Sequence, residues 1–433
     1  MASGGSSRMG YTLITIVVVL VVLATSKTWN PWPKWWAWFN TSEPIAAGVA
    51  RWQSTIGGSP QSVSIAGDAV IVEYRTSIEA YGLTAGIKLW GNDADWADVA
   101  GEGNDAVVVT GRLLTKGYQV LDPRSGAVRR ADTEATAVWT YRTGILDLRC
   151  GKGSDCELTA WDTRGNTRWR VSTGGIGFVL DAANPDLPDT KPMTANGIDD
   201  DVAGARQMPA LIGLPDDGKV RIIDTANGKL VQTAEPGSDQ RISVAGGRVL
   251  TVTGTSADGT CYFGVVASDP PGGGTVWKRD GLNLRTAANG SGCKQDRDPA
   301  GGEDVVLGVD PVGRQELIAA HDGRILWHGA KGEEVQAVND SYAVVRTADK
   351  STLRCLSLAS GGTAWTRPFT SGGAALTPNA VVIVTTKPGR VAALSPSSGK
   401  LLTEVRTNAK IFATGPGGMI VVDGRDMAYL PFA

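Results

Sequence analysis

The chain has 433 residues and a formal net charge of −2, and it is rich in glycine, with 56 of them. This length allows two or three ordinary domains or one large repeat domain. No lysine- or arginine-rich run is present, which argues against nucleic-acid binding by bulk electrostatics, so we expect no nucleic-acid partner. The only two histidines, His321 and His328, leave little basis for a histidine metal site or a catalytic triad, and we expect them in surface loops beside a strand.

The first 47 residues have the pattern of a membrane anchor. Residues 1–10 are small and polar with one cation, and residues 11–26 form an uncharged apolar stretch of 16, a little under the ~20 that usually span a bilayer. Five tryptophans and two lysines follow over 27–38, a composition typical of the lipid headgroup region. We predict a short cytoplasmic tail (1–10), a transmembrane anchor (11–28) and a tryptophan-rich juxtamembrane linker (29–47).

A cleaved signal peptide is the alternative interpretation of the same segment. Val22 and Ala24 fit a small-residue cleavage rule after the apolar core. Cleavage would carry the tryptophan cluster into water, which favours the anchor. Either interpretation leaves the remaining chain outside the cytoplasm, and we expect a single-pass protein of the cell membrane.

The cysteine positions agree with an extracytoplasmic location. Cys150 and Cys156 flank the polar turn GKGSD between two apparent strands, which is good hairpin geometry for a disulfide. Cys261 and Cys293 are candidates for a second disulfide across a longer connection. Cys355 is left over, and we expect it to be a small buried hydrophobe. The cysteine spacing matches no zinc pattern, and we predict no metal ligands.

A short phrase recurs along the rest of the chain. It consists of an apolar strand end, a polar turn with a glycine, and a second strand. The clearest copies are AYGLTAGIKLW (80–90), AWDTRGNTRW (160–169), IAAHDGRILW (318–327) and SLASGGTAW (357–365), and weaker copies lie at 120–130, 222–231, 266–277 and 393–402. In five of the eight copies a tryptophan stands four residues after the glycine. Repetition at this scale indicates stacked supersecondary units.

Each unit divides into four short strands. Valine, isoleucine and tyrosine alternate with polar residues in these segments, and glycine, aspartate, asparagine and serine separate them. Four-stranded units repeated around an axis describe a β-propeller. The segment GVARW at 48–52 repeats the glycine-to-tryptophan spacing without preceding strands, and 411–432 resembles three strands without a closing turn. Joining the two would complete one blade from both ends of the chain.

The count of units is eight plus the joined one. Because propellers usually have 4–8 blades, we predict an all-β, eight-bladed β-propeller over 48–433, with nine blades as the alternative. Two insertions interrupt the repeat, a Pro/Asp-rich one at 184–204 and a glycine- and charge-rich one at roughly 281–303. Loops of this kind often bind partners, so both insertions are candidate contact elements.

The phrase A-x-D-x-x-x-G-x-x-x-W resembles the repeat of the PQQ-like propellers. That family includes quinoprotein alcohol dehydrogenases and the non-enzymatic outer-membrane-protein assembly lipoprotein, and the chain is more similar to the non-enzymatic branch. The resemblance implies that the tryptophan that closes each blade docks against the next blade. The residues concerned are Trp52, Trp90, Trp169, Trp277, Trp327 and Trp365.

The enzymatic branch does not fit the residues. Quinoprotein dehydrogenases clamp their quinone with a disulfide between adjacent cysteines, and this sequence has no adjacent cysteine pair and no c-type haem motif. We therefore predict no cofactor and no catalytic residues. The acid run Asp199, Asp200 and Asp201 is expected to be a solvated loop. Three aspartates occupy the same position in three of the turns, and we expect them to cap backbone N–H groups. They are Asp122, Asp162 and Asp224.

These observations favour a membrane-anchored propeller that acts outside the cytoplasm as a binding or scaffold module. Its partner would be a protein or a component of the cell envelope. The alternative is an extracytoplasmic hydrolase or lyase with its site at the central channel, which predicts polar side chains with perturbed pKa values there. A sensor domain is a third hypothesis, but it would need a membrane partner because residues 1–10 cannot hold an output domain.

Overall fold

The structure is a computed structural model, and it describes residues 45–433 except 46–47, 152–154, 174–185, 194, 271, 285–292 and 294–297. The predicted tail, the transmembrane anchor (11–28) and most of the linker (29–47) lie outside the described residues. The chain divides after Pro44, and Ile45–Ala433 forms one compact unit. Within the part of the chain that the structure describes, no helix is long and apolar enough to cross a bilayer.

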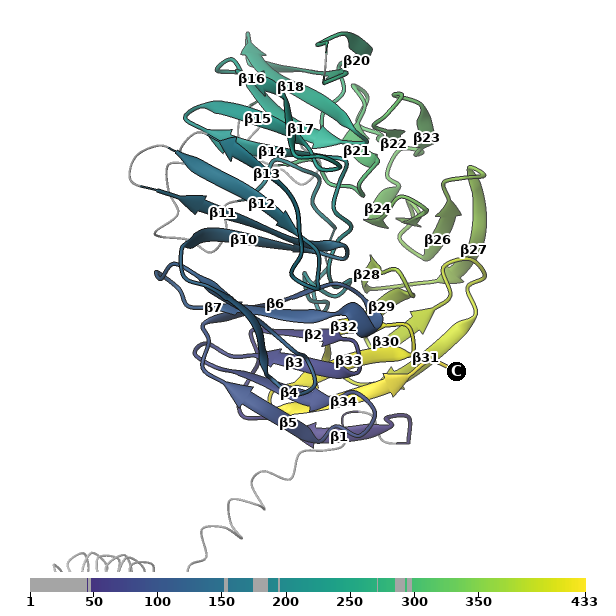
Figure 1. The fold of residues 1–433 in the computed structure, drawn as a ribbon. Coiled ribbons are helices and arrows are strands. Elements are labelled where there is room, and N and C mark those ends of the chain that lie inside the picture. The colour runs from purple at the N-terminus through teal and green to yellow at the C-terminus, as the bar shows by residue number, and fades with distance from the viewer. Residues whose placement is uncertain are drawn as a thin grey trace, which may run out of the picture. The chain divides into compact units, whose positions relative to one another are not determined.

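The described residues of this unit contain 34 strands, no α-helix and one short 3₁₀ turn, η1 (Gly103–Asp105). The strands form nine antiparallel sheets, which are the blades of a propeller (Figure 1).

Blades 1 to 3 have four strands each. Their strands are β2 (Ser62–Ala66), β3 (Ala69–Glu73), β4 (Ile78–Gly82) and β5 (Lys88–Asn92); β6 (Trp96–Ala100), β7 (Val107–Gly111), β8 (Tyr118–Leu121) and β9 (Val128–Asp132); and β10 (Ala135–Tyr141), β11 (Gly144–Cys150), β12 (Cys156–Trp161) and β13 (Thr167–Thr173).

Blades 4 and 6 have three strands each, and blade 5 between them has four. Their strands are β14 (Leu211–Asp216), β15 (Lys219–Asp224) and β16 (Lys229–Ala234); β17 (Gln240–Ala245), β18 (Arg248–Ala257), β19 (Thr260–Ser268) and β20 (Thr275–Asp280); and β21 (Val305–Val309), β22 (Gln315–Ala319) and β23 (Ile325–His328).

Blades 7 to 9 again have four strands each. Their strands are β24 (Glu334–Val338), β25 (Tyr342–Arg346), β26 (Thr352–Ser357) and β27 (Gly362–Pro368); β28 (Gly372–Leu376), β29 (Val381–Thr386), β30 (Gly389–Leu394) and β31 (Leu401–Arg406); and β32 (Lys410–Gly415), β33 (Gly418–Asp423) and β34 (Asp426–Pro431) with β1 (Trp52–Thr55).

The two ends of the chain share blade 9, as the sequence predicts. β1 pairs with β34 in antiparallel register, with Trp52 opposite Tyr429, so the first and last strands lie side by side (Figure 1). The rings of Trp52 and Tyr429 also stack, with centroids 6.1 Å apart. The first and last strands of the chain are thus held in one sheet, which closes the ring by backbone pairing.

The predicted number of eight blades is wrong, and the alternative of nine is correct. The glycine turn of the repeated phrase connects the last two strands of a blade. It therefore marks a blade even where another strand is missing. Blades 4 and 6 keep this turn, with Gly228 between β15 and β16 and Gly323 between β22 and β23, and lack only a paired first strand. Each copy of the phrase therefore corresponds to one sheet.

Burial differs systematically across each blade. The second strand of blade 1, β3, is almost entirely buried, whereas the fourth strand, β5, is exposed along most of its length. First strands of consecutive blades contact one another; for example, β2 contacts both β6 and β32. The first strand of a blade therefore lies nearest the axis and the fourth lies at the outer rim.

Nine clusters of buried apolar side chains hold the blades together, one at each interface between neighbours in the described unit. The cluster between blades 9 and 1 includes Phe412, Ile420 and Val63, so the last blade packs on the first in the same way as any other pair. Burial of apolar surface is the main stabilising term. The apolar packing that joins every other pair of blades therefore also joins blade 9 to blade 1.

Candidate functional site in the central channel

Residues 186–193 and 195–206, which include most of the first insertion, run inside the ring, and we call them the channel segment. It is hydrogen-bonded to first strands on opposite sides of the propeller. Val244 N of blade 5 donates to Pro188 O at 2.8 Å, whereas Asp199 N donates to Ile411 O of blade 9 at 2.8 Å. Thr414 N of blade 9 donates to Val202 O at 3.0 Å. A segment that reaches first strands of blades 5 and 9 must cross the channel that those strands line.

Both ends of the channel segment are fixed to further blades. At its start, Lys191 N donates to Pro299 O at 2.9 Å beside blade 6. At its end, the backbone N and Nε of Arg142 in blade 3 donate to Arg206 O and Ala205 O, each at 2.8 Å. The segment also replaces missing strands, since its Leu187 packs in the cluster of blades 3 and 4, where blade 4 lacks a first strand.

Close approach to blade 8 depends on a glycine. A Cβ built on Gly373 of β28 would lie 2.2 Å from the Cβ of Ala195, which is closer than any real contact. Only glycine allows the channel segment to lie so near this strand. The insertion therefore differs from the exposed contact loop expected from sequence, because its described residues are packed against the innermost strands.

Ion pairs tie the channel segment to the ring. Asp199 is only 6% exposed, and its Oδ2 lies 2.6 Å from Nζ of Lys410 on blade 9. Asp189 accepts from Arg206 and Lys191, each at 3.1 Å. The expectation of a solvated loop at Asp199–Asp201 is thus wrong at Asp199, because the sequence gives no sign of the lysine that it meets 211 residues later. Asp200 and Asp201 remain exposed.

Three cavities surround the channel segment. Two of them, of about 390 and 450 Å³, share Arg142, Gly204 and Pro378 and lie where the first and second strands of several blades connect. We call this end of the channel the mouth. The third, of about 290 Å³, lies beside the first strands of blades 2 and 3 and is lined by Asp98 and Tyr141. The channel segment therefore divides the channel into small polar spaces.

Carboxyl groups in these cavities resist ionisation. Burial, with the nearby charge of Asp340, raises the pKa of Glu303 to about 7, although Arg206 and Arg142 oppose the shift. Loss of solvation also raises the pKa of Asp98 to about 6, although hydrogen bonds from Thr140 and Val99 oppose the shift. Asp201 keeps part of its surface exposed, yet the surrounding protein and the charges of Asp199 and Asp200 raise the pKa of its carboxyl group. Perturbed carboxyl groups in a cavity are the feature that the enzyme alternative predicted.

Replacing Glu303 by glutamine is expected to stabilise the protein at pH 8 and to change little at pH 4. A carboxyl group whose pKa is higher in the folded state contributes stability below its unfolded pKa of about 4.5 and loses it as pH rises through about 7. Glutamine keeps the acceptor for the backbone N–H of Gln207 but cannot ionise. Thermal unfolding across pH measures this, and Glu134→Gln at an exposed loop is the matched control. An equal gain in stability at pH 8 from Glu303→Gln and Glu134→Gln would contradict the assignment of the effect to ionisation of Glu303.

Five of the six tryptophans that the sequence predicts to dock on the next blade lie against a turn glycine. The pairs are Trp52 with Gly86, Trp90 with Gly126, Trp169 with Gly228, Trp277 with Gly323 and Trp365 with Gly399. Each of the five indoles donates its Nε1 proton to a backbone carbonyl near that turn, at 2.7–2.9 Å. A Cβ at any of these glycines would approach the ring to within 2.9 Å. Each tryptophan is thus both a wedge and a hydrogen-bond donor at a blade interface.

One known family matches the part of the chain that follows the middle of blade 5. The family described as outer membrane protein assembly factor BamB matches residues 262–368 and 349–432, from the middle of blade 5 to the end of blade 9. This match supports the PQQ-like propeller repeat that the sequence predicts. No curated protein matches it.

Solved structures similar to this PQQ-like propeller include BamB from Moraxella catarrhalis, which is 16% identical with a TM-score of 0.35, over 88% of this chain and 100% of that one. Quinohemoprotein alcohol dehydrogenase from Comamonas testosteroni is 13% identical with a TM-score of 0.37, over 88% of this chain and 76% of that one. The computationally designed protein Ika8 is 13% identical with a TM-score of 0.39, over 89% of this chain and 100% of that one.

Four interfaces of the PQQ-like propeller, those that follow blades 2, 4, 6 and 8, depart from the tryptophan pattern. Blades 4 and 8 have Gln232 and Thr403 at the position of the tryptophan. Trp327 of blade 6 packs in the cluster of blades 6 and 7 but does not lie within 4 Å of a Cβ built on Gly361 of blade 7. Blade 2 has Arg130 in place of the tryptophan, and its guanidinium lies 3.4 Å from the centroid of Trp161 on blade 3. Such a stacked cation can replace an aromatic contact. Sequence reasoning missed this residue, although Arg130 stands four residues after Gly126.

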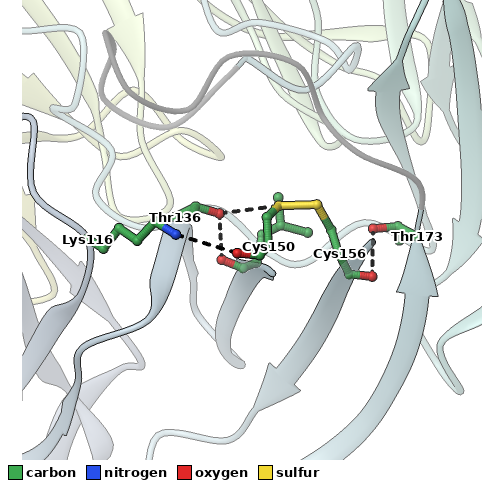
Figure 2. Close-up of a disulfide and its surroundings, with 6 residues drawn as sticks. Lys116, Thr136, Cys150, Cys156 and Thr173 are labelled. Atoms are coloured by element: carbon green, nitrogen blue, oxygen red, sulfur yellow. Dashed lines mark hydrogen bonds between the residues drawn. A yellow bond between two sulfur atoms is a disulfide. The ribbon is translucent and has the colours of Figure 1, made fainter. Parts of the chain in front are cut away.

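The cysteines pair as the sequence predicts. Cys150 and Cys156 form a disulfide between directly opposite residues of β11 and β12 (Figure 2). Nζ of Lys116 donates to Cys150 O at 3.5 Å, and the Thr173 hydroxyl donates to Cys156 O at 3.4 Å (Figure 2). A second disulfide joins Cys261 on β19 to Cys293 in the second insertion. Cys355 is free and buried, and burial raises the pKa of its thiol to about 12.

Replacing both Cys150 and Cys156 by serine is expected to lower the free energy of unfolding by about 2 kcal/mol. The bond closes a short loop, with a separation of 6 residues, so it restricts the unfolded chain only modestly. Denaturant unfolding of the full-length protein measures the loss. Unchanged stability would mean that the disulfide does not restrict the unfolded chain.

The remaining candidate residues serve the scaffold. Carboxylates of Asp122, Asp162 and Asp224 accept backbone N–H groups of their own turns, as capping predicts. Asp310, Glu316 and His328 bring three ligand atoms within 4.8 Å. However, Arg314 Nε lies 2.8 Å from Asp310 and Arg279 Nη1 lies 3.4 Å from Glu316, so two arginines already balance the two carboxylates.

Proposed function

We propose that this PQQ-like propeller is a non-enzymatic scaffold that binds protein partners in the cell envelope, and that residues 11–28 anchor it to the membrane. The observation that carries the proposal is the channel segment. Its backbone and ion pairs occupy the channel, where an enzyme of this shape would place its substrate. The family match to outer membrane protein assembly factor BamB supports a protein-binding role.

The mouth is the surface that this proposal assigns to the partner. Its rim consists of connections between first and second strands, including Glu102 of blade 2 and Asn379 of blade 8. Loops on a rigid scaffold are the usual binding elements of such folds. The membrane anchor would keep this surface outside the cytoplasm and near other envelope proteins.

Photo-crosslinking in intact cells tests the proposal. A photoreactive amino acid at Glu102 or Asn379 is expected to give a crosslinked product that contains a second protein. The same amino acid at Asn92, an exposed position at the opposite end of blade 1, is the control. Absence of any product specific to the mouth positions would exclude a partner there.

An enzyme acting in the channel is the second candidate, and the raised pKa values of Glu303 and Asp98 favour it. Both carboxyl groups already have structural partners: Glu303 accepts from the backbone of Gln207, and Asp98 accepts from Thr140 and Val99. Hydrolysis of an envelope polymer that is lost in the Glu303→Gln variant, with folding retained, would establish this candidate instead.

A further inference from the structure

Positive charge is concentrated in one part of the chain. Residues 350–410 contain eight lysines and arginines and one acid, Glu404, whereas the whole chain has a net charge of −2. The cations stand far apart in the sequence, so no basic run is visible. The sheets bring several of them together at the interface between blades 7 and 8.

Two arginines come from the face of blade 7 that packs on blade 8. Arg346 on β25 is in register with Leu353 on β26, and Leu353 is in register with Arg367 on β27. Residues directly opposite one another in a sheet project to the same face. Leu353 belongs to the cluster between blades 7 and 8, so both arginines project to this interface.

Two more arginines come from the facing side of blade 8. Arg390 on β30 is directly opposite Arg406 on β31. Like charges in that position destabilise a sheet. Glu404, two residues before Arg406 on the same face, lies 3.5 Å from Arg390 and 3.7 Å from Arg367. The exposed Lys350 and Lys387 stand in the two turns at this end of the blades. We call these six cations the basic cleft.

The basic cleft has more donors than acceptors. Glu404 lies farther from both arginines than the 2.7–2.9 Å usual for a direct charged hydrogen bond. Nε of Arg390 is buried without a hydrogen-bond partner among the described residues. The second acid nearby, Asp349, uses its oxygens for Thr347 and Ser351 in its own turn. Arg346 already donates to the backbone carbonyls of Lys350 and Thr370, so the guanidinium groups available to further carboxylates are those of Arg367, Arg390 and Arg406.

We propose that the basic cleft binds an acidic, carboxylate-bearing segment of a partner protein. Glu404 already shows how a carboxylate is shared between arginines of the two blades, and arginine presents a planar fork that matches a carboxylate. The cleft lies at the end of the blades where second and third strands connect, opposite the mouth. This proposal goes beyond the proposed function, because it adds a second surface whose test is independent of crosslinking at the mouth.

Binding of a labelled poly-L-glutamate peptide to the full-length protein tests this inference. The triple variant Arg367→Gln, Arg390→Gln, Arg406→Gln is expected to weaken binding by about tenfold or more, since each exposed pair contributes modestly. The matched control is Arg124→Gln, Arg164→Gln, Arg324→Gln, which removes equal charge from side chains that are 76%, 74% and 66% exposed on blades 2, 3 and 6. Binding should also weaken as salt is added.

A second variant keeps the inference testable if the triple variant does not fold. Glu404→Gln removes the internal competitor and is expected to tighten poly-L-glutamate binding several-fold. Equal losses in the triple variant and its control, or no change in Glu404→Gln, would overturn the proposal. Phosphatidylglycerol vesicles that bind more tightly than the peptide, with the same dependence on the three arginines, would assign the cleft to a lipid surface instead and also overturn it.

Discussion

Replacing Trp277 by alanine is expected to lower the free energy of unfolding by about 3–5 kcal/mol. The indole is only 9% exposed and packs in the cluster between blades 5 and 6. It lies against Gly323, and its Nε1 donates to Ala320 O at 2.7 Å. Alanine removes the buried ring and leaves that carbonyl without its donor. Denaturant unfolding of the full-length protein measures the loss.

Trp277→Phe separates the two contributions. Phenylalanine retains most of the buried ring but has no N–H for Ala320 O, so its expected cost is about 1–3 kcal/mol. An alanine variant no less stable than the phenylalanine variant would mean that the ring does not join the two blades. A phenylalanine variant as stable as the wild type would mean that the hydrogen bond contributes nothing.

The repeated phrase predicts much of the architecture because its parts interact locally. The turn glycines, the tryptophans four residues later and the final blade built from both ends are found where the pattern places them. The number of blades follows from the direct count of the phrase and not from the general range for propellers. Blades 4 and 6, which lack a paired first strand, still contain the turn that was counted.

The channel could not be predicted in the same way, since its contacts join distant residues. Asp199 and Lys410 are separated by 211 positions, and Gly373 is required only because Ala195 lies against it. An insertion rich in proline and aspartate has the composition of an exposed loop. Its place inside the ring depends on backbone hydrogen bonds to first strands, which leave no signal in the sequence.

The basic cleft was missed for a related reason. Arg346, Arg367, Arg390 and Arg406 are spaced by 16 to 23 residues, so a search for basic runs does not find them. The alternation of side chains along a strand and the register between strands place all four at one interface. Net charge over a window of one or two blades would have shown the excess.

Gly228→Ala is expected to destabilise the propeller by about 2–5 kcal/mol, whereas Gly165→Ala is expected to cost about 1–2 kcal/mol. Both glycines have left-handed backbone conformations, with φ of +74° and +87°, so the two variants share the cost of a side chain there. They differ in what the new methyl group meets. At Gly228 it would lie 2.5 Å from Cε3 of Trp169, and at Gly165 nothing lies within 4 Å, since the preceding blade has Arg130 where others have tryptophan.

The difference between these variants isolates the contact between tryptophan and glycine from the strain of the turn. Denaturant unfolding of both, measured under one set of conditions, should give a gap of about 1–3 kcal/mol, which is the usual cost of overpacking. Removing the ring should remove the gap, so Gly228→Ala in a Trp169→Ala background should cost no more than Gly165→Ala does alone. A gap that persists in that background would place its origin in the turn itself, and the wedge would then not explain why glycine recurs at the blade interfaces.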